Sequence, residues 1–366
     1  MRYKTMKKSG VDISAITVGT WAIGGANSLG ASYGEVDDTE SIRAIQAMID
    51  GGVNLIDTAP IYGSGHSEEV VGKAIKGYDR DKIVLATKYG SYIEDGKGVH
   101  KSTPASIERE FADSVHRLGT DYFDIYLMHW PDDFGTPIKD TMEYVQKLKD
   151  EGKVKMLGLC NVDTDYIAQA SEYADIDIVQ LPFSMVNQAD LHQLQWCEEH
   201  NIDVMTWGSL GSGILTGAIR EKPNFAENDF RNTFYPFYKE PMFSKIQEFL
   251  KTMDAVSQKY GKPLAQIAIN WSTQKSFVTT ALTASATCTR PKRTAPPSSG
   301  SSLRRISTCS MPSSSALASR RPLPKAYACI GTSLEGRMSD MLVRPFSLSV
   351  DDACQRLVML YDGNTL

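Results

Sequence analysis

One alternation runs through most of the chain and constrains its fold more than any other feature. Short apolar runs rich in β-forming residues alternate with segments whose apolar residues recur at helical spacing. Strands that alternate with helices form parallel βαβ units. Eight such runs occur, at residues 14–21 (SAITVGTW), 53–59 (VNLIDTA), 82–88 (KIVLATK), 123–129 (FDIYLMH), 154–161 (VKMLGLCN), 177–184 (DIVQLPFS), 202–209 (IDVMTWGS) and 277–283 (FVTTALT).

Eight βα units in one chain predict a closed (β/α)8 barrel, the TIM-barrel fold, which typically needs ~250 residues. Helices are predicted within residues 39–52, 67–77, 104–119, 139–152, 165–174, 191–201 and 263–275. The competing architecture is a doubly wound open sheet, whose first strand is followed by a G-x-G-x-x-G turn. The corresponding stretch here reads VGTWAIGG and does not match, so the barrel is favoured.

Polar side chains recur where the predicted strands end. Asp57, Lys88 and His129 follow three consecutive apolar runs. In a barrel of this kind the C-terminal strand ends surround one site, so these side chains are expected to converge. Each residue alone is more often a cap, a surface lysine or a structural histidine, but their recurrence at matching positions favours a shared site. The other strand-end residues are Thr20, Trp21, Asn161, Gln180, Trp207 and Ser209.

The chemistry of these groups predicts proton transfer to a carbonyl oxygen. Tyr62 follows Asp57 in the stretch DTAPIYGSG and is a neutral acid whose usual pKa is ~10. A nearby Lys88 ammonium is expected to lower that pKa, and Asp57 to pair with the buried lysine. His129 is expected to hydrogen-bond and orient the substrate oxygen. Together the four side chains suit an acid that delivers a proton while a hydride reaches the carbonyl carbon.

Six motifs in order carry a family resemblance: DTAPIYG, LATKYG, DIYLMHWPD, GLCN, VQLPFS and WGSLGSGILTG. They resemble the aldo-keto reductases, of the bacterial NADP-dependent oxidoreductase type, from about residue 3 to residue 283. The resemblance implies the barrel fold and reversible carbonyl reduction by a nicotinamide cofactor bound without a Rossmann domain. It also implies that Tyr62 is the general acid of a catalytic tetrad with Asp57, Lys88 and His129, and that no metal is needed.

The same resemblance implies the cofactor and substrate contacts. Asn161 and Gln180 would hold the nicotinamide carboxamide, Trp207 would stack on its ring, and the segment from Gly208 to Gly213 would cradle the pyrophosphate. The family's Ser-Asn is Cys160-Asn161 here, and its S-P-L-G-R-G lacks the Pro and Arg. Residues 228–238 (NDFRNTFYPFY) resemble the loop that covers the site. The expected cofactor contacts are Gly19, Thr20, Trp21, Asp57, Asn161, Gln180, Trp207, Ser209, Leu210, Gly211, Ser212 and Gly213, and the expected substrate pocket is Trp21, Tyr62, His129 and Trp130.

The composition changes abruptly after residue 283. Residues 284–366 are rich in Ser, Pro, Arg, Thr and Ala, and their 11 basic and 5 acidic side chains give a net charge of +6. Helical periodicity disappears, which predicts a largely disordered second region after a barrel domain at residues 1–283. A one-base shift of the reading frame permits the family's G-x-R and E-N loop, which grips the adenosine 2′-phosphate. A frameshift after about residue 283 is therefore our hypothesis for this tail.

A metal-binding or nucleic-acid-binding role suits the tail less well. Its cysteines, Cys288, Cys309, Cys329 and Cys354, are spaced too widely and irregularly for a zinc module. Its positive charge suits a nucleic-acid arm, but interleaved aromatic residues are lacking. No run approaches the ~20 apolar residues of a membrane span, and no apolar signal region follows the basic start.

The prediction is a cytoplasmic carbonyl reductase that uses NADP(H), with NAD(H) as the alternative cofactor, and that has no nucleic-acid or membrane partner. Its partner is a small carbonyl substrate whose identity stays open, as do the oligomeric state and the physiological direction. Two alternatives remain. One is a non-catalytic nicotinamide-binding subunit of the same fold, and the other is a defective product of a frameshifted gene.

Overall fold

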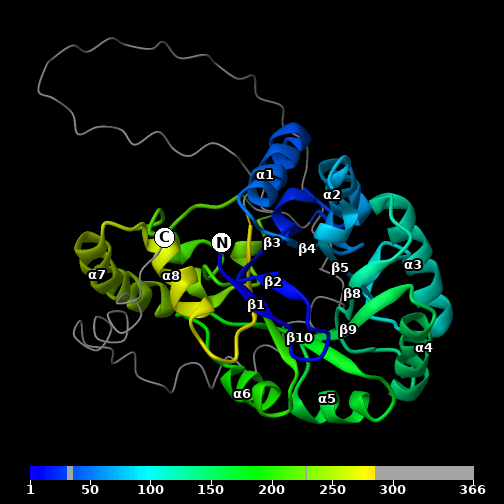
Figure 1. Cartoon of the computed structure of the whole chain (residues 1–366). Helices are drawn as coiled ribbons and strands as arrows, with labels where there is room; N and C mark the ends of the chain where they lie inside the picture. The colour runs from blue at the N-terminus through cyan, green and yellow to red at the C-terminus, as the bar shows by residue number, and fades with distance from the viewer. Residues whose placement is uncertain (31–35, 227–228, 285–366) are drawn as a thin grey trace, which may run out of the picture.

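A computed structural model describes residues 1–30, 36–226 and 229–284 of the 366-residue chain. Within them, eight parallel strands close into a barrel, which confirms the predicted fold (Figure 1). Every apolar run identified in the sequence overlaps one barrel strand. In barrel order the strands are β3 (Ile16–Gly19), β4 (Leu55–Asp57), β5 (Val84–Tyr89), β8 (Phe123–Met128), β9 (Val154–Cys160), β10 (Ile176–Pro182), β11 (Asp203–Trp207) and β12 (Thr280–Thr283).

Helices surround the barrel, and their ends follow the local sequence signals (Figure 1). The Thr103 side chain accepts a hydrogen bond from the Ser106 N–H at the start of one helix, which ends at Gly119 with a left-handed φ of 65°. Asp37 and Asp163 cap two others in the same way. The helices are α1 (Asp38–Asp50), α2 (His66–Ile75), α3 (Pro104–Leu118), α4 (Ile138–Asp150), α5 (Thr164–Ser171), α6 (Leu191–Glu199), α7 (Met242–Tyr260) and α8 (Leu264–Thr273).

Helix α7 has no counterpart among the predicted helices, although its sequence carries the signal. Its buried side chains recur at three- and four-residue spacing, as expected for one face of a helix. They pack with α8 and with the segment after β11 in a cluster separate from the core around the barrel. The buried residues of α7 are Met242, Phe243, Ile246, Leu250, Met253 and Val256.

An N-terminal hairpin closes one end of the barrel. It pairs β1 (Tyr3–Thr5) with β2 (Asp12–Ser14) in antiparallel register, and in Figure 1 it lies across the barrel. Met6 and Ile13 belong to the same buried cluster as strand residues such as Leu127 and Met205. The turn of the hairpin hydrogen-bonds the first residues of two strands, Asp203 of β11 and Ile176 of β10. The strand ends that carry Asp57 and Lys88 therefore lie at the opposite mouth. The hairpin was not predicted, and neither was a second one, β6 (Tyr92–Glu94) with β7 (Lys97–Val99), between β5 and α3.

The predicted second region begins at Ala284, the last described residue, so all but its first residue lies outside the described part of the chain, and the boundary at residue 283 and the frameshift are not tested. They stay predictions. Within the described part, no helix has the length and apolar character needed to cross a membrane.

A buried carboxyl group joins α3 to the end of β5. Glu110 is 4% exposed, and its two carboxyl oxygens lie 3.1 and 3.2 Å from the backbone nitrogen of Gly90. Burial raises the pKa of Glu110 from 4.5 to about 8, against the opposing effect of the hydrogen bond from Gly90. This carboxyl group is therefore neutral at pH 7 in the folded protein.

The Glu110 pKa predicts how stability changes with pH. The unfolded chain loses this proton near pH 4.5, whereas the folded protein keeps it to about pH 8. The folded state is thus favoured most below pH 4.5 and loses on the order of 4 kcal/mol as the pH rises to 8. We expect Glu110→Gln to remove most of this loss, measured by denaturant unfolding between pH 4.5 and 9. Glu108→Gln, at an exposed position of α3, is the control. An unchanged pH dependence in Glu110→Gln would contradict the assignment.

Candidate active site

A buried lysine lies at the centre of the barrel mouth. The Lys88 side chain is fully buried, and its Nζ lies 2.8 Å from both carboxylate oxygens of Asp57. The same atom lies 2.8 Å from the carbonyl oxygen of Thr58 and 3.3 Å from the hydroxyl oxygen of Tyr62. Register explains the meeting, because Asp57 ends β4 and pairs with Ala86 of β5, two residues before Lys88. The strand ends thus bring the predicted acid, lysine and carboxylate together.

The ion pair keeps Lys88 charged. Burial, the largest single effect, lowers the pKa of Lys88, but the Asp57 carboxylate together with the neighbouring Tyr62 and Cys160 side chains raises that pKa above its usual value. Asp57 also accepts a hydrogen bond of 2.9 Å from Nε2 of Gln180. An unpaired ammonium would be very costly at this depth, so the carboxylate is a structural requirement as well as an electrostatic one.

The Tyr62 phenol is held as a neutral acid. Burial raises its pKa, whereas the Lys88 ammonium acts in the expected direction and lowers it. The net effect is a raised pKa, because burial is the larger contribution. The prediction that Lys88 lowers the Tyr62 pKa is therefore correct for the contribution of Lys88. It is wrong for the net pKa of Tyr62, which is raised. Since Lys88 donates to the phenol oxygen, the phenol's own hydrogen is available to another acceptor.

His129 completes the predicted set of four. It follows β8, and its ring centroid lies 5.6 Å from that of Tyr62 with the planes at 79°. Burial, and then the nearby Lys88 charge, hold the pKa of His129 well below its usual value. The imidazole is therefore neutral at pH 7. Its Nδ1 is buried without a hydrogen-bond partner among the described residues, whereas Nε2 is not among the buried atoms that lack a partner, so Nε2 is the ring nitrogen open to a ligand.

Two predicted cofactor residues link His129 to an aromatic platform. Nδ2 of Asn161 donates to the His129 carbonyl at 3.0 Å, and Nε1 of Trp207 donates to Oδ1 of Asn161 at 3.2 Å. These bonds fix the orientation of the Asn161 amide and leave one of its N–H groups unused. Asn161 has a φ of 59°, a left-handed value that Asn adopts more readily than most residues. Trp207 ends β11, at the edge of the mouth.

The segment after β11 can hold a phosphate group. Four of its residues have left-handed φ values, from 55° to 95°, and such turns point backbone N–H groups toward one another. The hydroxyl groups of Ser209 and Ser212 are buried without a hydrogen-bond partner in the described structure. Buried donors without partners fit an anionic ligand that would accept from them. The four residues are Gly208, Gly211, Ser212 and Gly213.

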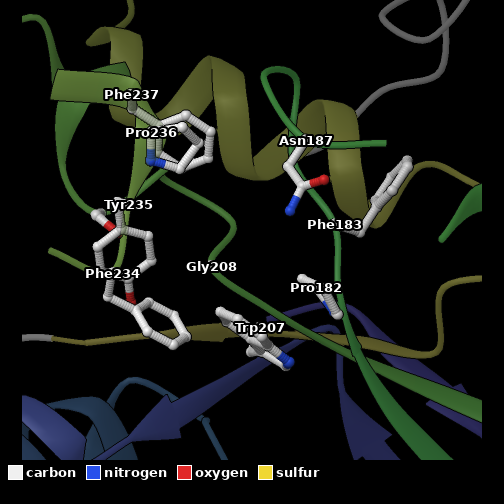
Figure 2. Close-up of a pocket in the computed structure, with 10 residues that line it drawn as sticks. Pro182, Phe183, Asn187, Trp207, Gly208, Phe234, Tyr235, Pro236 and Phe237 are labelled. Atoms are coloured by element: carbon white, nitrogen blue, oxygen red, sulfur yellow. The ribbon is translucent and has the colours of Figure 1, made fainter. Parts of the chain in front are cut away.

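A cavity of about 50 Å³ lies between the phosphate-compatible segment and the predicted covering loop (Figure 2). In the figure, Trp207 lies at one side, Asn187 at another, and Phe234 and Tyr235 face the space between them. The hydroxyl of Tyr238 donates to the Ser212 carbonyl at 2.8 Å, so the loop is attached to the segment. The predicted covering loop therefore lies against the site, as far as its described residues, from Asp229 onward, show.

The remaining predicted residues fall into three sets. Trp21 packs against Phe230 of the covering loop, with ring centroids 5.5 Å apart, and Trp130 against His100 at 5.6 Å. Both tryptophans are thus on aromatic walls at the mouth. Gly19 pairs with Asp57, and the Thr20 hydroxyl donates to the Asp57 carbonyl at 2.9 Å, so this pair supports the strand end. Leu210 lies in the phosphate-compatible segment.

Three contacts at the site were not predicted. The Thr58 carbonyl is a third acceptor for Lys88, and His100 and Phe230 complete the aromatic walls. A backbone carbonyl leaves no signal in a sequence, because every residue has one. His100 lies just after the unpredicted β6–β7 hairpin, so its position depends on that hairpin.

Comparison with known proteins identifies the relatives of this chain. Residues 15–294 match the family model described as "Aldo/keto reductase family". The aldo-keto reductase YhdN of Bacillus subtilis is 35% identical over 274 residues, covering 74% of this chain and 81% of that protein. The NADH-specific methylglyoxal reductase of Escherichia coli is 33% identical over 279 residues, covering 73% and 84%.

Solved structures give the same result. The glycerol dehydrogenase AKR11B4 of Gluconobacter oxydans superposes with a TM-score of 0.70 at 33% identity, covering 78% of this chain and 86% of that one. An aldo/keto reductase of Klebsiella pneumoniae, in complex with NADP and acetate, superposes with a TM-score of 0.59 at 26% identity, with the same coverage.

The buried ion pair predicts an energetic coupling between Asp57 and Lys88 in the stability of the protein. Asp57→Asn leaves the Lys88 ammonium without its counter-charge, so we expect it to reduce the free energy of unfolding by about 3–5 kcal/mol. Adding Lys88→Met should restore part of that loss, because the double variant buries no unpaired charge. Chemical denaturation of the two single variants and the double variant measures the coupling.

An exposed pair provides the control. Lys251 and Glu248 lie 2.7 Å apart with most of each side chain exposed, so Lys251→Met and Glu248→Gln should show no measurable coupling. Equal coupling in the buried and exposed cycles, or strict additivity in the buried one, would contradict the role given to Asp57.

Proposed function

The chain belongs to the aldo/keto reductase family, and on that premise we propose that it reduces an aldehyde or ketone to an alcohol, with Tyr62 as general acid. The observation that carries this proposal is the contact of Lys88 Nζ with the Tyr62 hydroxyl oxygen, 3.3 Å long, beside the Asp57 carboxylate. A proton donor must leave a stabilised anion, and the Lys88 ammonium is placed to stabilise the negative charge of the Tyr62 phenolate.

The proposed proton step uses only side chains of the tetrad. Tyr62 donates its hydrogen to the carbonyl oxygen, and the resulting phenolate is stabilised by the Lys88 ammonium. Asp57 holds Lys88 in place and keeps it charged. His129 is neutral, so its Nε2–H would donate to the carbonyl oxygen without adding a second positive charge beside Lys88. A bound reduced nicotinamide would supply the hydride.

The phosphate-compatible segment and the amide groups support a nicotinamide dinucleotide as cofactor. The unpartnered hydroxyls of Ser209 and Ser212 fit the pyrophosphate, and Trp207 is a flat platform for the nicotinamide ring. Among the described residues, Asn161 keeps one free N–H, and Oε1 of Gln180 accepts only a weak hydrogen bond, of 3.7 Å, from the Cys160 thiol. One free donor and one available acceptor suit a carboxamide.

We propose NADP(H) as the preferred cofactor, with NAD(H) as the alternative. The Klebsiella relative was solved with NADP, whereas the E. coli relative is named as NADH-specific. The residues expected to grip the 2′-phosphate follow residue 283, beyond the described structure. Preference therefore depends on the tail, whose origin by a frameshift remains a proposal that sequencing the gene would test. A cytoplasmic location is proposed because the six cysteines show no close pairing in the sequence.

Substitution of the proposed acid tests the mechanism. Tyr62→Phe removes the only hydroxyl that Lys88 contacts in the described structure, so turnover of a carbonyl substrate should fall by ~10²–10⁴-fold. Cofactor affinity should change little, because the platform and the phosphate-compatible segment are untouched. Tyr126→Phe is the matched control, since the Tyr126 hydroxyl is buried without a partner among the described residues. Unchanged turnover in Tyr62→Phe would favour a non-catalytic binding subunit.

Titration with NADPH and, separately, NADH tests the cofactor. We expect both to quench tryptophan fluorescence, because Trp207 and Trp21 lie at the mouth. Quenching at lower concentrations of NADPH than of NADH indicates a 2′-phosphate contact. Equal, weak quenching by the two cofactors indicates that the residues after 283 do not supply that contact. Quenching by neither cofactor would contradict nicotinamide binding and favour a defective product.

A further inference from the structure

A histidine outside the tetrad joins two loops at the barrel mouth. His66 is the first residue of α2, four residues after Tyr62. Its Nδ1 lies 3.1 Å from the carbonyl oxygen of Gly24, in the β3–α1 connection. Its Nε2 lies 2.9 and 3.1 Å from the two carboxylate oxygens of Asp38, at the start of α1. The imidazole ring therefore ties the start of α2, which follows the Tyr62 loop, to both the β3–α1 connection and the start of α1.

The partners determine the protonation state of this ring. A carbonyl oxygen and a carboxylate can only accept hydrogen bonds, so each ring nitrogen must donate to keep both contacts. Only the imidazolium has a hydrogen on both nitrogens. When the ring loses a proton, it keeps one of the two bonds at most. The bridge is thus complete only in the charged form.

The surroundings favour the charged form. Partial burial alone would lower the pKa of His66, but the Asp38 carboxylate, the Gly24 carbonyl and then Glu69 raise it above its usual 6.5. Lys73 on α2 opposes this, with its Nζ 3.9 Å from Asp38, and so does the positive end of α2. About a third of the His66 side chain is exposed, so protons exchange freely with solvent.

A short backbone route connects this bridge to the proposed acid. A Cβ built on Gly24 would lie 2.9 Å from the backbone carbon of Tyr62, and one built on Gly63 would collide with the Gly24 carbonyl oxygen. The two loops therefore touch through bare backbone at the Tyr62–Gly63 peptide. The carbonyl that packs on the Tyr62–Gly63 peptide is the one that His66 holds.

We propose that His66 is a positioning residue for Tyr62, and that its imidazolium, bridging Gly24 and Asp38, holds the two loops in the arrangement that aligns the phenol. This inference rests on the proposed carbonyl reduction for its effect on turnover. His66 contacts neither the tetrad side chains nor the phosphate-compatible segment in any described contact, so it acts through the loops. Cofactor binding is expected to be independent of it.

The bridge gives the reaction a pH dependence of defined sign. The folded pKa of His66 is raised, so the bridge is complete below pH 6.5 and is lost as the pH rises through the raised pKa. The turnover number should fall by about threefold to fivefold across that ionisation, the scale of one partly exposed charged contact. The Tyr62 phenol does not explain such a limb, because its own pKa is raised.

Turnover numbers measured from pH 5.5 to 9 test the proposal with three variants. His66→Gln should abolish the alkaline limb. Its turnover number should stay, at every pH, at the lower value that the wild-type protein shows at high pH. Asp38→Asn should move the limb to lower pH, because the carboxylate that raises the His66 pKa is gone. His192→Gln, at an exposed position of α6, is the control and should leave the profile unchanged. The cofactor dissociation constant should be the same in all four proteins.

A second readout does not depend on activity. In wild-type protein labelled on histidine rings and glycine amides, the Gly63 and Gly24 amide signals should titrate with the His66 ring. In Asp38→Asn all three should shift together to lower pH. An unchanged turnover profile in His66→Gln would overturn the positioning role, even if that variant melts at a lower temperature. Gly63 and Gly24 amide signals that do not change as the His66 ring titrates would overturn the bridge.

The two readouts separate the proposals. If the wild-type protein reduces no carbonyl at any pH, the proposed function fails, and the glycine signals still decide whether His66 aligns the Tyr62 loop. If His66→Gln does not fold, Asp38→Asn decides both questions.

Discussion

The ammonium of Lys88, fully buried at the mouth of a barrel, is the group around which the rest of the site is built. Its charge is tolerated because the Asp57 carboxylate, the Thr58 carbonyl and the Tyr62 hydroxyl surround it within 2.8 to 3.3 Å. Every one of these contacts requires strands β4 and β5 to lie in one register. The pairing of β4 with β5 is thus the condition for the ion pair, and the ion pair is the condition for a phenol whose anion can be stabilised.

Rigid strands and adaptable loops have separate tasks in this molecule. The strands place the charges, while the loops supply aromatic walls, unpartnered hydroxyls and the segment that carries Tyr62. The loops are held by few but specific contacts, such as the Tyr238 hydroxyl on the Ser212 carbonyl and the His66 ring between Gly24 and Asp38. Because His66 and Asp38 are partly exposed, their contact can respond to pH more readily than the core does.

The features that could be predicted from the sequence are those that leave a local pattern of residues. Apolar runs of strand length and the polar residue after each run placed Asp57, Lys88 and His129 at one mouth, since βαβ geometry brings strand ends together. The sequence did not predict what depends on packing. The Thr58 carbonyl has no local signal, the net rise in the Tyr62 pKa reflects burial that only the fold creates, and His66 needs a partner far along the chain. Helix α7 is different, because its apolar spacing is present in the sequence although no helix was predicted there.

The most direct test of the central claim is a crystal structure of the protein with NADP and acetate, the pair found in the Klebsiella relative. The acetate carboxylate stands in for a substrate carbonyl. If Tyr62 and His129 act on one oxygen, that oxygen should lie within hydrogen-bond distance, ~2.6–3.2 Å, of both the Tyr62 hydroxyl and the His129 Nε2. Acetate bound elsewhere, or a Tyr62 hydroxyl turned away from both Lys88 and the ligand, would contradict the account.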